Sequence, residues 1–423
     1  MASLAVMLAV GGVELDKFMA EGWLQHLGWI YSGGAEGASL LLGTVAGSMI
    51  AIAGTVFSMT LVALSLASSQ LGPRLLRNFM RDTANQLVLG TFVATFVYCL
   101  LVLRTIRRAD EAAFVPHLAV SIGVLLAMVS IGVLIYFIHH VSVSVQADEV
   151  VAQVGREVEE GIDRLFPGHL GKPASEASAA VGENDLPAAF AREACPVGAL
   201  EDGYLQQIDA DALMKLAGEE DLLLRLECRP GHYLVKGRTM VMVWPGERVT
   251  DSLVKKMNAT FVLGDQRTAT QDLEFSFHQL VEIAVRALSP GVNDPFTAIA
   301  CVDRLGSGLC RLAECDMPSP RRFDADGRLR LVSPESPFAG VVDTSLNQIR
   351  QSARSNPAVA IRMLGAIAQI ADHVRHAEDT ACLQRHAGMI IRGAREAVPE
   401  ADDLRAVEAA FAKATQALRG RDG

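Results

Sequence analysis

The pattern of hydrophobic and polar positions divides the chain into an apolar first third and a mixed remainder. No charged side chain occurs between residues 38 and 70. About 20 apolar residues suffice for a helix to cross the hydrocarbon core of a bilayer. We therefore predict a membrane-spanning helix at 38–70, and two further apolar runs predict a second span at 86–106 and a third at 114–141.

The amino-terminal segment is apolar but short. Residues 1–13 are too few to cross a bilayer, and Glu14, Asp16 and Lys17 follow at once. No basic segment precedes them, although a secretory signal would require one. We expect either a first span that is cut short at Met1 or a short anchor at the membrane surface.

One face of the helix at 38–70 carries small and hydroxylated side chains at heptad spacing, beside a row of glycines. In lipid, helices associate where small residues let backbones approach and hydroxyls bond across the interface. This face, the hydroxyl seam, therefore meets protein or water, either by packing inside a bundle or by lining a pore or polar cavity. Its residues are Gly43, Thr44, Gly47, Ser48, Gly54, Thr55, Ser58, Ser65 and Ser69.

Basic residues follow the first predicted span at helical spacing, namely Arg74, Arg77 and Arg81. They indicate an amphipathic helix at the cytoplasmic membrane surface, which serves as a topogenic loop, binds anionic headgroups or takes part in gating. A second basic group at 104–108 lies on the opposite side of the membrane, so the positive-inside rule favours the two possible orientations almost equally. Most cysteines follow the third span, and reduced thiols are typical of the cytoplasm, which places Arg74–Arg81 and the soluble part inside.

Composition agrees with a membrane part joined to soluble domains. The chain has 423 residues, 50% of them hydrophobic, and a formal net charge of −10. This acidic balance argues against a general nucleic-acid binder. Seven cysteines without a Cys-x-x-Cys pair do not form a disulfide framework. We predict no cofactor, and membrane lipid as a partner.

Changes in pattern mark five regions. We predict a transmembrane domain at 1–141, a helical extension at 142–170, a linker at 171–195, a small β module at 196–248 and a mainly helical cytoplasmic domain at 249–423. The β module contains short alternating runs separated by Pro-Gly and Lys-Gly turns. Its GHYLVKG piece loosely resembles the turns of biotinyl-lipoyl-like barrels, but Lys236 lacks the usual hairpin context of a modified lysine.

In the last region, residues 317–340 are expected to be a polar connection, and amphipathic helices are expected at 341–376 and 379–418. The four-residue set His373, His376, Glu378 and His386 superficially resembles metal ligands. Only the first pair has helical spacing, and the set matches no established ligand pattern, so we predict a solvated or inter-helix role rather than a metal site. His139 and His140, at the end of the third span, read as an interfacial polar cap rather than a proton relay.

The most distinctive polar stretch of the soluble part is a corner between two predicted helices. A helix at 275–288 ends at Ser-Pro-Gly, and a new helix begins at Asp294–Pro295, since Asp is a favoured N-cap and Pro suits the first helical position. Backbone N–H groups at this start could hold an anion or a carboxylate substrate. The corner is therefore a structural turn, a ligand site or a catalytic site, and its candidate residues are Arg286, Ser289, Asn293, Asp294 and Thr297.

Four motifs in order resemble the predicted bacterial membrane proteins of domain of unknown function 2254: GTVFSMTLVALSLASSQLGPRLLRNFMRD, QLVLGTFVATFVYCLLVLR, IYFIHHVSVSVQ and RALSPGVNDPFTA. The resemblance covers nearly the whole chain. It implies a complete first helix ending in an element like Glu14-Leu15-Asp16, and hence four spans with the amino terminus and the soluble part inside. The family brings no established activity.

Together these observations predict an α-helical integral membrane bundle with three full spans and a truncated first span, followed by a cytoplasmic α+β region with a helical C-terminal part. The leading hypothesis is a bacterial inner-membrane homo-oligomer built around the hydroxyl seam, channel- or transport-like, with a ligand-sensing cytoplasmic domain. The alternatives are a membrane-tethered enzyme that uses the loop at 286–297 and a scaffold that binds another protein. No catalytic set or phosphate-binding glycine loop is present in the sequence, which argues against an enzyme.

Overall fold

The computed structural model describes residues 1–18, 31–71, 83–107, 114–144, 146–166, 186–315, 319–334 and 338–420, without the side chains of 66–71 and 143–144. The chain divides into two compact units, Met1–Glu149 and Val150–Gly423. Each unit has its own packing, and the two are described in turn.

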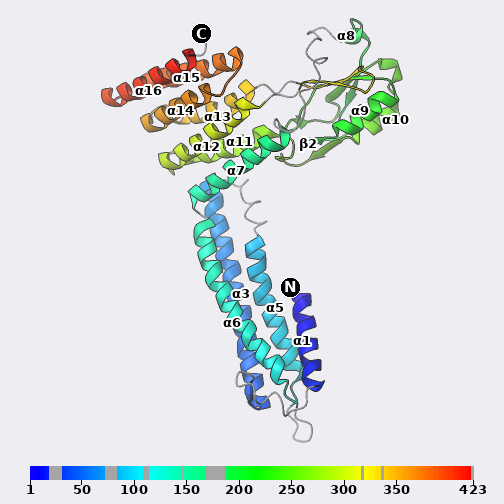
Figure 1. Ribbon diagram of the computed structural model, residues 1–423, viewed down its shortest axis with the longest axis vertical. Helices are drawn as coiled ribbons and strands as arrows, with labels where there is room; N and C mark the ends of the chain where they lie inside the picture. Colours follow the sequence, from blue (N-terminus) through cyan, green and yellow to red (C-terminus); the bar gives the residue numbers. More distant parts are fainter. Residues whose placement is uncertain are drawn as a thin grey trace. The chain divides into compact units, whose positions relative to one another are not determined.

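The first unit is a bundle of four helices, which Figure 1 shows lying side by side. They are α1 (Ala2–Phe18), α3 (Ala35–Leu71), α5 (Thr83–Thr105) and α6 (His117–Ser144). Among the described residues, α3, α5 and α6 are long and apolar enough to cross a membrane. The three predicted spans are thus confirmed as helices that could do so.

Helix α5 holds this bundle together, because it packs against α1, α3 and α6. Its Phe92 and Tyr98 are fully buried. Two pairs of buried polar groups inside the bundle lie within hydrogen-bond distance, as a low-dielectric environment favours. The Tyr98 hydroxyl donates to the Ala119 carbonyl at 2.8 Å, and the Thr95 and Ser130 hydroxyls lie 3.1 Å apart.

One end of the bundle is joined by hydrogen bonds between residues far apart in the sequence. The Asp16 carboxylate accepts from the backbone N–H groups of Leu118 and Ala119 at 3.0 and 2.9 Å, and so caps the beginning of α6. His117 Nδ1 lies 2.7 Å from the Tyr31 carbonyl oxygen. The acidic residue that ends the first apolar segment therefore connects α1 to α6.

The second unit contains two small sheets, whose strands are β1 (Cys195–Gly198), β2 (Gly203–Ile208), β3 (Leu223–Leu226), β4 (Tyr233–Leu234), β5 (Thr239–Trp244), β6 (Phe261–Gly264), β7 (Arg321–Phe323) and β8 (Leu329–Val332). One sheet has the order β1-β5-β3-β8-β7 and the other β4-β2-β6. Short helices accompany them: α8 (Phe190–Glu193), α9 (Ala210–Glu219), α10 (Asp251–Asn258) and the 3-10 turn η3 (Gly246–Arg248). Strands from beyond residue 248 thus complete the sheets of the predicted β module.

The prediction of a polar connection at 317–340 was wrong, because β7 and β8 lie within it. Strand β8 pairs in parallel with β3, about a hundred residues earlier in the chain. Its Arg330 is 7% exposed and donates to Asp221 at 2.8 Å and to Asp324 at 2.7 Å. A strand that contains paired arginines looks like a polar loop in the sequence.

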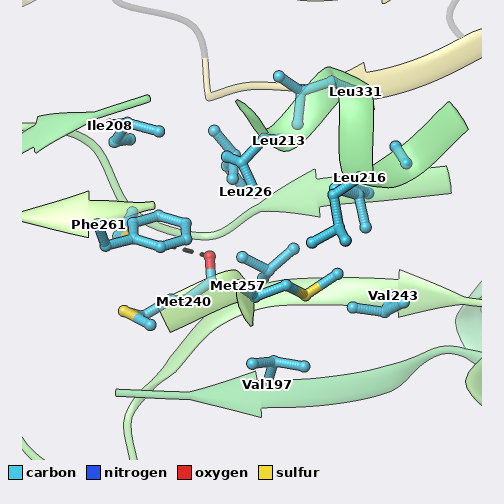
Figure 2. Close-up of a cluster of buried hydrophobic side chains, with 14 of the residues drawn as sticks. Val197, Ile208, Leu213, Leu216, Leu226, Met240, Val243, Met257, Phe261 and Leu331 are labelled. Atoms are coloured by element: carbon cyan, nitrogen blue, oxygen red, sulfur yellow. Dashed lines mark hydrogen bonds between the residues drawn. The ribbon is translucent and has the colours of Figure 1, made fainter. Parts of the chain in front are cut away.

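The core of the sheet region consists of apolar side chains from strands, α9 and α10. Figure 2 shows Leu213 and Leu216 of α9 and Met257 of α10 among strand residues such as Val243 and Leu331. These side chains point toward one another from elements spread over more than a hundred positions. This core unites the early strands with β8.

The rest of the second unit is helical. Its helices are α7 (Ala147–Leu165), α11 (Leu273–Ala287), α12 (Pro295–Glu314), α13 (Phe338–Ser352), α14 (Pro357–Ala371), α15 (Ala377–Ala397) and α16 (Ala401–Arg419). Figure 1 shows α11 to α16 layered against one another. Each of the two long amphipathic stretches forms two helices, and Asn356 caps the second helix of the first stretch, with Pro357 at its first position.

Within the unit, α7 packs closely on α12. Val158 and Ile162 of α7 are fully buried. A Cβ at Gly308 would lie 2.9 Å from Val158 Cγ1. The two helices can therefore approach this closely because residue 308 has no side chain. Arg311 donates to both carboxylate oxygens of Asp163, at 2.9 and 2.7 Å.

Candidate functional site

The hydroxyl seam lies on the surface of the four-helix bundle. The other face of α3 is buried in the bundle, through Ala38, Leu42, Ala46, Met49, Ala53, Val56 and Ala63. Thr44, Ser48, Thr55 and Ser58 each follow a buried residue by two positions, which is about 200° around a helix of 3.6 residues per turn. All four are exposed, as are Gly47, Gly54 and Ser65, while Gly43 is partly buried. The packing of α3 on α5 and α6 therefore uses the face opposite the seam.

The glycines of the seam leave open space beside α3. Among the described residues, no atom outside the backbone of α3 itself comes within 4 Å of a Cβ built on Gly43, Gly47 or Gly54. By contrast, a Cβ at Gly123 of α6 would lie 2.9 Å from Leu42 Cδ2, because that glycine permits close packing inside the bundle. The seam is thus a notched surface that the described part of the unit does not fill.

Seam hydroxyls bond along their own helix. Thr44 Oγ1 donates to the Leu40 carbonyl at 2.7 Å, and Thr55 Oγ1 to the Ala51 carbonyl at 3.1 Å. A hydroxyl with such a bond can face lipid, protein or water without leaving its proton unpaired. The side chain of Ser69, and Arg74, Arg77 and Arg81, lie outside the described residues.

At the end of α6, Tyr136 stacks on His140, with ring centroids 5.6 Å apart.

In the second unit, Lys236 lies between β4 and β5, which belong to different sheets. Its backbone N–H donates to Asp202 at 2.6 Å.

The corner between α11 and α12 brings its predicted residues together, and they bond to one another. Ser289 Oγ donates to the Arg286 carbonyl at 2.6 Å. Asn293 adopts a left-handed backbone with φ of 49°. The Asp294 carboxylate then accepts from the N–H groups of Phe296 and Thr297, both at 3.1 Å, and from the Thr297 hydroxyl. The first N–H groups of α12 are therefore already occupied by the protein's own carboxylate.

The charges at the corner agree with this arrangement. The hydrogen bond from the Thr297 hydroxyl, supported by the two backbone N–H groups, lowers the pKa of Asp294. Arg286 lies 3.9 Å from Glu282, one turn earlier on α11. An anionic ligand at this helix start would have to displace Asp294. The geometry supports a structural turn more than a ligand site.

Replacing Asp294 with alanine should weaken the beginning of α12 by about 1 kcal/mol, the usual loss for an N-cap. Because the pKa of Asp294 is lowered in the folded state, its contribution is present at neutral pH and is lost as pH falls through that lowered pKa. Hydrogen exchange of the first turn of α12, from pH 7 down to pH 3, measures both effects. Asp294→Asn, which retains a capping oxygen, is the control. If Asp294→Ala kept its stability but abolished an enzymatic activity of the protein, Asp294 would instead be catalytic.

The histidines of the last region do not form the set that their sequence positions suggest. His373 Nδ1 lies 2.7 Å from Glu314 Oε1, and His376 is the N-cap residue of α15. His386 instead lies beside Asp343 and Cys382, and the potential ligand atoms of these three side chains all lie within 4.8 Å of one another. Sequence reasoning missed Asp343 and Cys382. The four-residue spacing of Cys382 and His386 was a usable signal, whereas Asp343 comes from another helix.

Three apolar helices that could span a membrane, followed by a soluble region of helices and small sheets, define the class as that of membrane proteins with a large soluble part. The chain belongs to the family described as "Predicted membrane protein (DUF2254)", whose model matches residues 1–369. This confirms the resemblance found in the sequence motifs.

Among its relatives are uncharacterized proteins of Mycobacterium bovis and Mycobacterium tuberculosis. Each is 32% identical over 423 residues, which is 99% of this chain and 77% of the relative. No solved structure matches the chain.

Proposed function

We propose that this protein is a subunit of a homo-oligomer in the bacterial inner membrane, channel- or transport-like, in which the hydroxyl seams of neighbouring copies meet. The observation that carries the proposal is the exposure of the seam on α3, while the opposite face packs in the bundle. Small residues on a helix surface let a second backbone approach closely in lipid, where large apolar side chains gain nothing by meeting. A second copy supplies a matching seam by symmetry.

The orientation we propose places the second unit in the cytoplasm. All seven cysteines are free thiols, and six of them lie in that unit. Free thiols persist in a reducing compartment. Helix α1 would lie in the membrane with the other three, since its outer face exposes Leu4, Met7 and Val10.

The second unit would then sense a ligand and pass the signal to the membrane part. The alternative of a membrane-tethered enzyme depends on the corner at 286–297, whose Asp294 already caps a helix. A scaffold that binds another protein would use the same exposed seam. We expect that a second copy occupies it instead.

Cysteine cross-linking in native membranes tests the proposal. Thr55→Cys and Ser58→Cys, on the seam, should give disulfide-linked dimers upon oxidation, because neighbouring seams place these positions opposite each other. Ile131→Cys, on an exposed face of α6, is the control and should give none. Monomeric protein with no seam cross-links would contradict the assembly. Cross-linked protein that gives no ion flux in liposomes at several voltages and pH values would retain the assembly and exclude conduction.

A further inference from the structure

The side-chain cluster between α13 and α15 has the composition of a metal site. Asp343 comes from α13, and Cys382 and His386 lie one turn apart on α15. His386 is fully buried, Cys382 is 6% exposed and Asp343 is partly buried. His386 Nε2 lies 2.6 Å from Asp343 Oδ1. One carboxylate, one thiol and one imidazole thus converge from two helices, and Asp343 and His386 are 43 positions apart in the sequence.

A second observation sets this cluster apart from an ordinary histidine–carboxylate pair. The other ring nitrogen of His386, Nδ1, is buried and has no hydrogen-bond partner among the described residues. A buried polar atom without a partner costs about 1–3 kcal/mol. Such an atom calls for an explanation, and an ion bound to that nitrogen would provide one.

We propose that Asp343, Cys382 and His386 bind a transition-metal dication of the zinc type. Zinc accepts this combination of oxygen, sulfur and nitrogen ligands, at distances of about 2.0–2.3 Å. A thiolate disfavours the hard cations magnesium and calcium, which prefer oxygen ligands. Ligand atoms that already lie within 4.8 Å of one another need only small side-chain movements to surround one ion.

Arg385 supplies the positive charge at this cluster in the structure. Its Nη2 lies 2.6 Å from Asp343 Oδ1 and 3.4 Å from Cys382 Sγ. Its side chain is 49% exposed, so the guanidinium can move into solvent when a dication arrives. Arg385 and the metal therefore compete for the same carboxylate and sulfur.

A bound dication requires a neutral His386 imidazole and a Cys382 thiolate, so the thiol must release its proton to solvent as the ion binds. Burial lowers the pKa of His386, and the nearby charges of Arg385 and Arg350 lower it further. The hydrogen bond to Asp343 acts in the opposite direction and raises this pKa. Burial raises the pKa of the Cys382 thiol, whose charged neighbours are Arg385, Asp343 and Asp379.

Cobalt(II) titration of the full-length, tag-free, chelator-treated protein in detergent tests the site. We expect one cobalt per chain with thiolate-to-cobalt charge-transfer absorption, and displacement by zinc. Cys382→Ser should abolish that absorption, and Asp343→Asn should weaken cobalt binding at least ~100-fold, since even the partners of metal ligands contribute 10–100-fold. Arg385→Gln should strengthen binding about 10-fold, because it removes the competing charge.

His373→Ala is the matched control, because His373 also pairs with a carboxylate, that of Glu314, but is not one of the three clustered potential ligands found among the described residues. It should leave the titration unchanged. Both Cys382→Ser and Asp343→Asn retain nearly the native shape, and circular dichroism checks their fold. Absence of the charge-transfer absorption in the parent protein, or its persistence in Cys382→Ser, would overturn the proposal.

Discussion

Replacing Gly47 with leucine is expected to dissociate the proposed homo-oligomer while leaving each protomer folded. Gly47 lies on the exposed seam of α3, with open space beside its Cα, so the bundle accommodates the new side chain. A neighbouring α3 could not approach as closely, because its backbone would meet the leucine. We expect self-association to weaken at least ~10-fold, equivalent to about 1.4 kcal/mol. Sedimentation or single-molecule photobleaching in detergent or lipid measures the change.

Two other substitutions calibrate this result. Gly123→Leu should destabilise the protomer itself by about 1–3 kcal/mol, since even a Cβ at this position would lie 2.9 Å from Leu42 Cδ2. Val129→Leu, at an exposed position of α6, should change neither folding nor association. If Gly47→Leu remains as oligomeric as the parent protein, the seam is not the interface.

Replacing Leu224 with alanine is expected to destabilise the sheet region by about 3 kcal/mol, within the range of large-to-small core substitutions. Leu224 is fully buried on β3, where it pairs with Val243 of β5 and Leu331 of β8. Removing its side chain leaves a cavity that strands held on both sides cannot easily close. Hydrogen exchange of the β3 and β5 amides in the full-length protein should therefore accelerate roughly 150-fold, if exchange there requires opening of this core.

The matched control is Val262→Ala on β6, where the side chain is 46% exposed. A substitution there should change stability by less than about 0.5 kcal/mol. Equal effects of the two substitutions would mean that Leu224 is not part of the core.

Features that depend on neighbours along the chain were predictable. The uninterrupted apolar runs predicted α3, α5 and α6, because a helix that crosses a bilayer satisfies its backbone hydrogen bonds within one segment. Asp294 and Pro295 likewise predicted the first residue of α12, since capping involves only the next three residues. The seam residues could also be identified from their spacing.

Features that join distant segments were not predictable in this way. The strand β8 escaped detection because its partner β3 lies far away and its arginines are paired with Asp221 and Asp324. The cluster of Asp343, Cys382 and His386 escaped for a similar reason, since the packing of α13 on α15 creates it.

The sequence by itself determined the membrane-compatible helices, the family and the residues of the hydroxyl seam, because each depends only on the composition and spacing of residues close together in the chain. The tertiary structure alone decided which face of α3 is buried, and so left the seam exposed. It also decided that Asp294 serves its own helix and that His386 meets a thiol and a carboxylate. The physical reason is that the spacing of residues along the chain indicates which side chains share a face of a helix or strand. Which distant residues that face contacts is decided only when the whole chain folds around a common core.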